Sequence, residues 1–167
     1  LAACEYGTDK GIFGYGYTTG NVSMSNLVSN SGVIATDVTG VGSARANVAA
    51  CAYGDDKGIF GYGNTASKVS LTNLVSNAGV CSADVTGVGT ARIGLAATQY
   101  GDDKGIFGYG DTGSVSSLSN LVSNAGVVAT DVTGVGTARF DLAACSYGGD
   151  KGIFGFGYDG SSVVGMT

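Results

Sequence analysis

The sequence predicts an all-β protein built from propeller-type blades of four antiparallel strands. Three observations predict this class: an internal repeat of 47 residues, 31 glycines without a single proline, and short segments with a period of two. Apolar residues make up 44% of the 167 residues and charged residues only 13%, which favours a buried core over disorder. No stretch approaches the roughly 20 apolar residues of a membrane-spanning helix, so we expect no membrane insertion.

Two motifs carry the repeat. The first runs from Asp9 to Gly16 and returns at 56, 103 and 150, with only Phe156 replacing the second aromatic residue. The second runs from Asn26 to Arg45 and returns at 73 and 120. About three and a half units are therefore present. We divide the single repeat domain, residues 1–167, into units 1–47, 48–94, 95–141 and an incomplete unit 142–167.

The first half of the unit predicts a hairpin. Residues 1–6 form the first expected strand, and residues 7–10 have the composition of a tight turn. In the strand that follows, a period of two places Phe13 and Tyr15 on one face and Ile12 on the other.

The second half of the unit predicts two more strands. Residues 22–29 form the third strand, residues 30–32 its turn, and residues 33–36, which are rich in β-branched side chains, the fourth. The glycine-rich segment 39–43 is expected to cross to the next unit. A sheet of this size cannot bury its own faces and must stack on copies of itself.

A four-stranded unit of this length is typical of a propeller blade. The alternative is a β-helix solenoid in which each unit contributes two parallel coils. The order of residues in the second unit is Arg45, Ala49-Ala50, Tyr53-Gly54, Lys57, Ile59-Phe60-Gly61-Tyr62-Gly63 and Asn73-Leu74-Val75.

This order resembles a kelch-type blade, in which an arginine and small residues precede an apolar strand that ends in glycines. The double glycine is split by a tyrosine and the kelch tryptophan is missing, so the resemblance is one of architecture. The motifs Asp-Lys-Gly-Ile-Phe-Gly-Tyr-Gly and Thr-Gly-Val-Gly-Thr-Ala-Arg also resemble repeats in predicted structural proteins of marine bacteriophages. That resemblance implies a location in a virion or on another extracellular surface, and no activity.

A closed propeller needs at least four complete blades, about 188 residues at this period. We therefore expect unpaired sheet at both ends of the row, which invites pairing with another chain. The expected partner is protein, either copies of the chain itself or the rest of a longer chain.

The charge pattern argues against several functions. The net charge is −5, and seven repeated Lys and Arg residues are balanced by seven repeated Asp residues. Without a basic stripe we expect no nucleic acid partner. The absence of histidine removes the commonest general base and metal ligand. We therefore predict no catalytic residues, no cofactor and no metal.

The four cysteines do not predict a disulfide framework. Cys4, Cys51 and Cys145 are equivalent positions at which the third unit has Thr98, while Ile and Val take the place of Cys81 in the other units. Exchange with residues of this size indicates small, buried packing residues rather than ligands or disulfide partners.

The repeated charged residues are interpreted as structural. We expect each turn aspartate to accept hydrogen bonds from backbone amides, each lysine to cover apolar surface with its stem, and the arginines to pair with Asp37, Asp84 and Asp131 or with carbonyls. The alternatives are a ligand site in every unit and a basic ring in a channel. The positions are Asp9, Lys10, Arg45, Asp56, Lys57, Arg92, Asp103, Lys104, Arg139, Asp150 and Lys151.

Specificity is expected in the loops that do not repeat, because a shared scaffold only positions them. These loops follow the aromatic strand, where neutral drift at a solvent edge would produce the same variation. The candidate binding residues are Tyr17, Asn21, Asn64, Lys68, Asp111 and Ser114.

The sequence thus predicts a non-enzymatic structural or receptor-binding β-propeller component of a phage virion or other extracellular assembly. The alternative is a carbohydrate-binding lectin with equivalent sites between blades, which would recognise surface glycan. A hydrolase is the third hypothesis, and it would need a close pair of carboxylates that no spacing in the sequence singles out.

Overall fold

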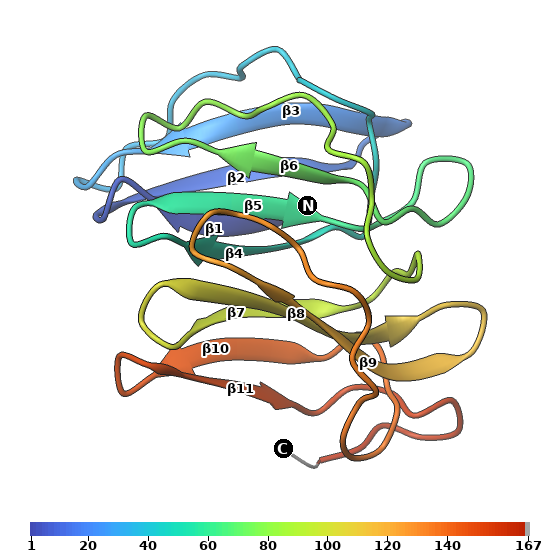
Figure 1. Cartoon of the computed structure of the whole chain (residues 1–167). Coiled ribbons are helices and arrows are strands. Elements are labelled where there is room, and N and C mark those ends of the chain that lie inside the picture. The colour runs from blue at the N-terminus through green and yellow to red at the C-terminus, as the bar shows by residue number, and fades with distance from the viewer. Residues whose placement is uncertain (166–167) are drawn as a thin grey trace.

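The computed structural model describes residues 1–165 as a row of small antiparallel sheets without any helix (Figure 1). The first sheet contains β1 (Ala2–Tyr6), β2 (Lys10–Tyr17) and β3 (Asn21–Val28); the second β4 (Ala49–Tyr53), β5 (Lys57–Gly61) and β6 (Thr72–Val75); the third β7 (Ala96–Tyr100), β8 (Lys104–Asp111) and β9 (Val115–Val122); and the fourth β10 (Ala143–Tyr147) and β11 (Lys151–Gly155). The predicted all-β class is confirmed.

Each sheet begins with the predicted hairpin, and its register recurs in every unit. Tyr6 pairs with Lys10 across the first turn, and Tyr53 pairs with Lys57 across the second. All ladders between the described strands are antiparallel. The parallel coils of the solenoid alternative are therefore wrong for residues 1–165.

The expected fourth strand does not form as a regular strand. Segment 33–38 meets β3 only through isolated bridges, Val28 with Ile34 and Ser25 with Val38. Between the bridges the Asn26 side-chain amide donates to the Ala35 carbonyl at 3.2 Å, in place of a backbone donor. Each complete sheet thus has three strands and an irregular outer edge.

Within residues 1–165 the fourth sheet has two strands. The segment that follows β11 forms two isolated bridges, Tyr158 with Phe140 and Tyr158 with Val163. The expected continuation of a third strand into Met166 and Thr167 lies outside the described residues.

The aromatic strand β2 contains a β-bulge, which makes the predicted orientation of its side chains wrong. The pairing of β2 with β3 shifts between Gly14 and Gly16, and Tyr15 between them has a φ of 61°. This left-handed conformation costs a non-glycine residue about 1–2 kcal/mol. Because the bulge inserts one residue, Phe13 and Tyr15 point to opposite faces rather than to the same face. The equivalent residues Tyr62, Tyr109 and Phe156 have φ values of 63°, 64° and 62°.

The sheets pack face to face in chain order, from β1–β3 at the top of Figure 1 to β10–β11 at the bottom. At each joint the phenylalanine of one sheet lies on a glycine of the preceding sheet. A Cβ atom on Gly14 would lie 2.8 Å from the Phe60 ring, and one on Gly61 would lie 2.6 Å from the Phe107 ring. The close approach therefore requires glycine, and it buries Phe60 and Phe107 completely.

The first strands of the four sheets lie next to one another. Residues of all four strands line one open hollow of about 230 Å³. Its lining residues are Cys4, Glu5, Cys51, Ala52, Ala97, Thr98, Gln99, Cys145 and Ser146. Every sheet thus turns its β1-type strand toward one common space and its irregular edge away from it.

No described segment forms a helix with the length and apolar character needed to cross a bilayer.

Replacing Phe107 with alanine tests the joint between sheets. Phe107 is completely buried and its ring stacks edge-on against Tyr62, with ring centroids 5.2 Å apart. We expect Phe107→Ala to lower the free energy of unfolding by about 3–5 kcal/mol, the usual cost of an aromatic truncation in a core. Val135→Ala is the control because Val135 is 86% exposed. Equal urea midpoints for both variants would show that the joint contributes little.

Candidate functional site

The repeated arginines sit at the joints between sheets. Arg92 is fully buried, with its guanidinium 4.3 Å above the Tyr62 ring of the second sheet. Three contacts are with the third unit: Nε donates to the Tyr109 carbonyl at 2.8 Å, Nη2 donates to the Asn120 side-chain oxygen at 2.6 Å, and Nη1 lies 3.8 Å from Asp131. Nη1 also donates to the Thr90 carbonyl of its own unit at 3.2 Å. The prediction that these arginines pair with aspartates and carbonyls is confirmed here.

Arg45 repeats this arrangement one unit earlier. It stacks on Tyr15 at 4.3 Å and pairs with Asp84 at 3.5 Å. Among the described residues Asp37 forms no ion pair with an arginine; it accepts a hydrogen bond from Asn26 at 2.7 Å. Arg139 stacks on the third sheet at 4.4 Å, but its buried Nε has no hydrogen-bond partner within residues 1–165.

Burial and hydrogen bonding set the protonation states of this network. Burial raises the pKa of Asp84 most strongly, but hydrogen bonds from Ser43 and Asn73 and attraction to Arg45 together outweigh it, so the pKa lies below its usual value. Burial raises the pKa of Tyr62 to about 12, which keeps its ring neutral beneath Arg92. The repeated charges are thus held in fixed, mutually compensating positions.

The turn aspartates are held mainly by side chains, which corrects the expectation of backbone amides. Asp56 accepts from the Lys57 ammonium at 2.6 Å and from the Asn77 amide at 3.0 Å. These two bonds lower the pKa of Asp56. The Lys57 ammonium is therefore paired within its own turn. The backbone N–H of Gly7, in the preceding sheet, donates to the Asp56 carbonyl at 2.7 Å.

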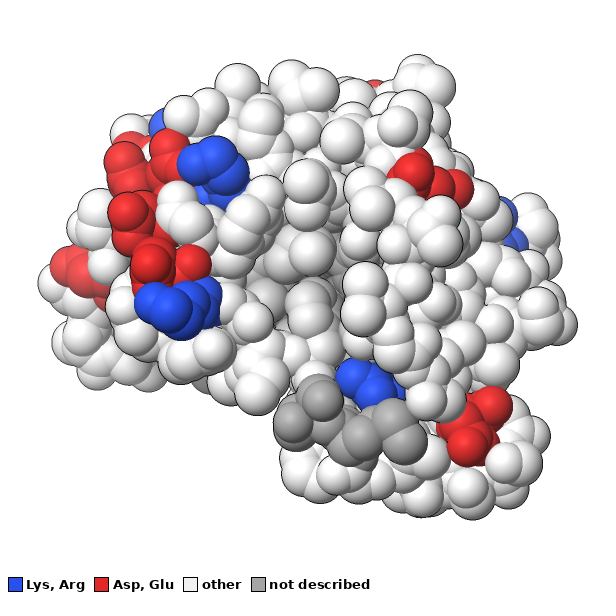
Figure 2. All heavy atoms as spheres, turned by 60° about the horizontal axis from the view of Figure 1, so that its bottom comes forward, with Lys and Arg blue, Asp and Glu red and all other residues white. Residues whose placement is uncertain are grey.

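The same pairing holds in the other turns, as Asp9–Lys10, Asp103–Lys104 and Asp150–Lys151. The hairpin turns lie on the left of Figure 1, and Figure 2 shows charged side chains gathered on that side of an otherwise mostly uncharged surface. Asn30 and Asn124 donate to Asp9 and Asp103 in the same way as Asn77 does to Asp56. Sequence reasoning missed these asparagines, although their recurrence with the turn was the available signal.

Four of the six variable-loop candidates link neighbouring sheets. The Asn21 amide donates to the Asn64 carbonyl at 3.1 Å, and the Lys68 ammonium pairs with Asp111 at 2.8 Å. Tyr17 projects into solvent with 69% of its surface exposed. Both contacts join positions 43 residues apart that are equivalent in the repeat, but the residue types at these positions change from unit to unit, so the conserved motifs did not single them out.

The two outermost sheets each present an uncovered apolar face. We call the face of the first sheet that carries Gly11 and Phe13 the leading face, and the face of the fourth sheet that carries Cys145 and Gly155 the trailing face. Phe13 is 39% exposed although its equivalents Phe60 and Phe107 are completely buried.

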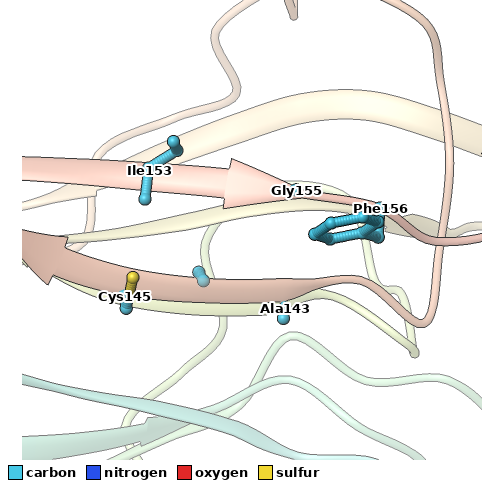
Figure 3. A pocket seen from close by; sticks show the side chains of 6 residues that line it. Ala143, Cys145, Ile153, Gly155 and Phe156 are labelled. Carbon is cyan, nitrogen blue, oxygen red and sulfur yellow. The ribbon is translucent and has the colours of Figure 1, made fainter. Parts of the chain in front are cut away.

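The trailing face is hollowed. A pocket of about 190 Å³ opens there (Figure 3), and Figure 3 shows Ile153 and Phe156 beside it. Phe156 is 59% exposed, whereas its equivalent Tyr15 is 5% exposed. The pocket is lined by Ala143, Ala144, Cys145, Ile153, Gly155 and Phe156.

The cysteines follow the same distinction between covered and uncovered faces. All four are free thiols; Cys51 is buried at a joint and Cys145 is exposed on the trailing face. Burial raises the pKa of Cys51 to about 12, so this thiol remains protonated. The prediction of a buried packing residue is confirmed for Cys51 and wrong for Cys145, because no further sheet covers it. Within residues 1–165, no three His, Cys, Asp or Glu side chains lie close enough together to hold a metal ion.

Comparison with known proteins identifies no family: no protein-family model matches the chain, and no curated protein matches it.

Replacing Arg92 with lysine tests the buried network. Lysine keeps the charge but lacks the planar fork that reaches Tyr109, Asn120 and Asp131 together. We expect Arg92→Lys to lower the free energy of unfolding by about 2–4 kcal/mol. Lys104→Gln, at an exposed and solvent-screened pair, should lower the free energy of unfolding far less than Arg92→Lys does. Urea denaturation measures both, and similar losses would contradict a special role for Arg92.

Acid should weaken the same network. The pKa values of Asp84 and Asp131 are lowered in the folded chain, so both contribute stability above the unfolded pKa of about 4. That contribution is lost as the pH falls through the folded values. We expect the melting temperature to drop between pH 5 and pH 3, and to drop less steeply in Asp131→Asn. Parallel curves for the two proteins would contradict this assignment.

Proposed function

We propose that the chain is a non-enzymatic structural or receptor-binding component of a phage virion or other extracellular assembly, with a propeller-type, kelch-like arrangement of its sheets. Two features support the propeller arrangement. The antiparallel sheets follow one another in chain order, and their first strands line one hollow. Propellers arrange their sheets radially around a central channel, so a shared hollow lined by the first strands supports this proposal.

The non-enzymatic proposal rests on the partners that the repeated polar residues bind within the chain. Arg45 and Arg92 are buried in joints between sheets, and the turn aspartates are bonded to their lysines and asparagines. Groups engaged in this way hold the scaffold and are not available for a substrate. The surfaces left for partners are the edge with the variable loops and the two outer faces.

The virion or extracellular setting rests on the resemblance of the repeated motifs to predicted marine phage structural proteins. Binding would use the variable-loop edge, where Tyr17 combines high exposure with a large contact area. The second and third units have Asn64 and Asp111 at that position and the fourth has Tyr158, so contacts there would differ between units.

Immunogold labelling with antibodies against the chain tests the location. Particles and cell envelopes from the source of the sequence should carry label on their outer surface, because a structural or receptor-binding component must be present there. Cytoplasmic protein from the same source is the comparison. Label confined to the cell interior would contradict the proposal.

A lectin is the second candidate, favoured by the hollow of about 180 Å³ beside Tyr17. Thr18 and Asn26 also line this hollow, so an aromatic ring lies beside hydrogen-bonding groups as sugar binding requires. A glycan array separates the two functions. Binding that is lost in Tyr17→Ala but kept in Val135→Ala would support the lectin, whereas an array without signal would leave the structural function as the better proposal.

A further inference from the structure

We propose that the leading face of one copy docks on the trailing face of a second copy, through the same joint that connects neighbouring sheets within the chain. The inference deepens the proposed structural function by naming its partner, and it rests on that function only for its biological setting. Three pairs of positions carry the argument.

The first pair is the phenylalanine and its glycine socket. Within the chain, Phe60 lies on Gly14, Phe107 on Gly61 and Phe154 on Gly108. Gly155 is the next equivalent glycine, and it lines the apolar pocket of the trailing face. Phe13 is the equivalent phenylalanine of the leading face, and it is 39% exposed. The aromatic residue and the hollow that matches it are therefore both accessible, at opposite ends of the row.

The second pair is a glycine and a cysteine. A Cβ atom on Gly58 would lie 2.5 Å from the Cys4 sulfur, and one on Gly105 would lie 2.7 Å from the Cys51 sulfur. At Gly11 the nearest atom to such a Cβ is Val28 Cβ at 3.6 Å, an ordinary contact. The leading face thus keeps the small residue that the joint needs, although within residues 1–165 no cysteine of another sheet packs against it.

On the trailing face, Cys145 is the equivalent of Cys4 and Cys51 and is exposed. In a joint between copies, Gly11 would lie over this sulfur as Gly58 lies over Cys4.

The third pair is a turn and a tyrosine. Gly79 and Gly126 pack against Tyr6 and Tyr53 of the preceding sheet, within 3.0 Å of an added Cβ. Gly32, the equivalent turn residue of the leading face, has nothing within 4 Å.

Tyr147 of the trailing face shows the matching exposure. It is 53% exposed, whereas Tyr6 is 4% and Tyr53 is 3% exposed. A second copy would cover Tyr147 with its Gly32 turn and complete the same contact.

A second copy is the occupant that these pairs specify, because each exposed position has its partner at the opposite end of an identical chain. Burial of two apolar faces supplies the driving force. The contact joins two different surfaces, so it produces a ring if the rotation closes and a filament if it does not.

Light scattering on the purified chain at increasing concentration tests the docking. We expect a mass that rises to a multiple of 16.4 kDa. Phe13→Asp and Gly11→Val should each return the mass to that of one copy while leaving the circular dichroism spectrum unchanged, since both positions tolerate change in the isolated sheet. A native chain that stays at 16.4 kDa throughout the concentration range overturns the proposal.

Cross-linking tests the geometry. Gly11→Cys should form a disulfide with Cys145 of the neighbouring copy under oxidised glutathione, because the equivalent Cβ-to-sulfur distances are 2.5 Å and 2.7 Å. A small shift brings them to the separation of about 3 Å across a disulfide, a covalent approach that the non-bonded methyl groups of valine at the same position cannot make. Non-reducing electrophoresis should show covalent oligomers that disappear in Gly11→Cys with Cys145→Ser. Val135→Cys, on an exposed position away from the joint, is the matched control and should give none.

Cross-linked species that persist without Cys145, or that form equally with Val135→Cys, would overturn the assignment of faces. The two proposals fail separately. A monomeric chain found on particle surfaces would sink the docking and leave the proposed function, whereas an oligomeric chain absent from those surfaces would do the reverse.

Discussion

The structure depends on the contact between a phenylalanine ring and a glycine of the neighbouring sheet. A three-stranded sheet has two faces and can bury neither alone, so each unit is stable only against another unit. A side chain larger than hydrogen at Gly14 or Gly61 would collide with the facing ring. The spacing of the sheets is therefore set by the absence of a side chain at these positions, whereas 18 of the 31 glycines have positive φ and serve turns and bulges.

The strained bulge and the buried arginine belong to the same joint. The left-handed conformation of Tyr62 is unfavourable by itself, but it directs the ring toward the next sheet, where it packs edge-on against Phe107 and beneath Arg92. Arg92 in turn needs several acceptors because a buried charge without partners is costly. Two backbone carbonyls, one amide oxygen and one carboxylate supply them. In each such joint, ring packing and the hydrogen bonds of the arginine thus offset the backbone strain of the tyrosine and the cost of burying a charge.

The same contacts limit where a partner can bind. The charged residues that recur in every unit are bonded to one another. Partners can therefore bind where the surface differs between units and where the two end faces are uncovered. The variable loops contain residues that hold the scaffold and residues that are free to bind: Lys68 and Asp111 join two sheets, while Tyr17 is exposed to solvent. The end faces are not specialised surfaces, since they are copies of surfaces that the chain already joins internally.

The sequence alone determined the all-β class, the unit length, the hairpin turn and the third strand, because these depend on local periodicity and on residues close along the chain. Tertiary structure decided the rest. The bulge at Tyr15 reversed the facing of its ring, and Asn26 replaced the backbone donors of a fourth strand. The hydrogen bond from the Asn21 amide to the Asn64 carbonyl joins different units, at positions whose residue types change along the repeat. Side-chain direction after a bulge, and contacts between non-repeated residues, depend on how the sheets approach one another, and no local spacing encodes that approach.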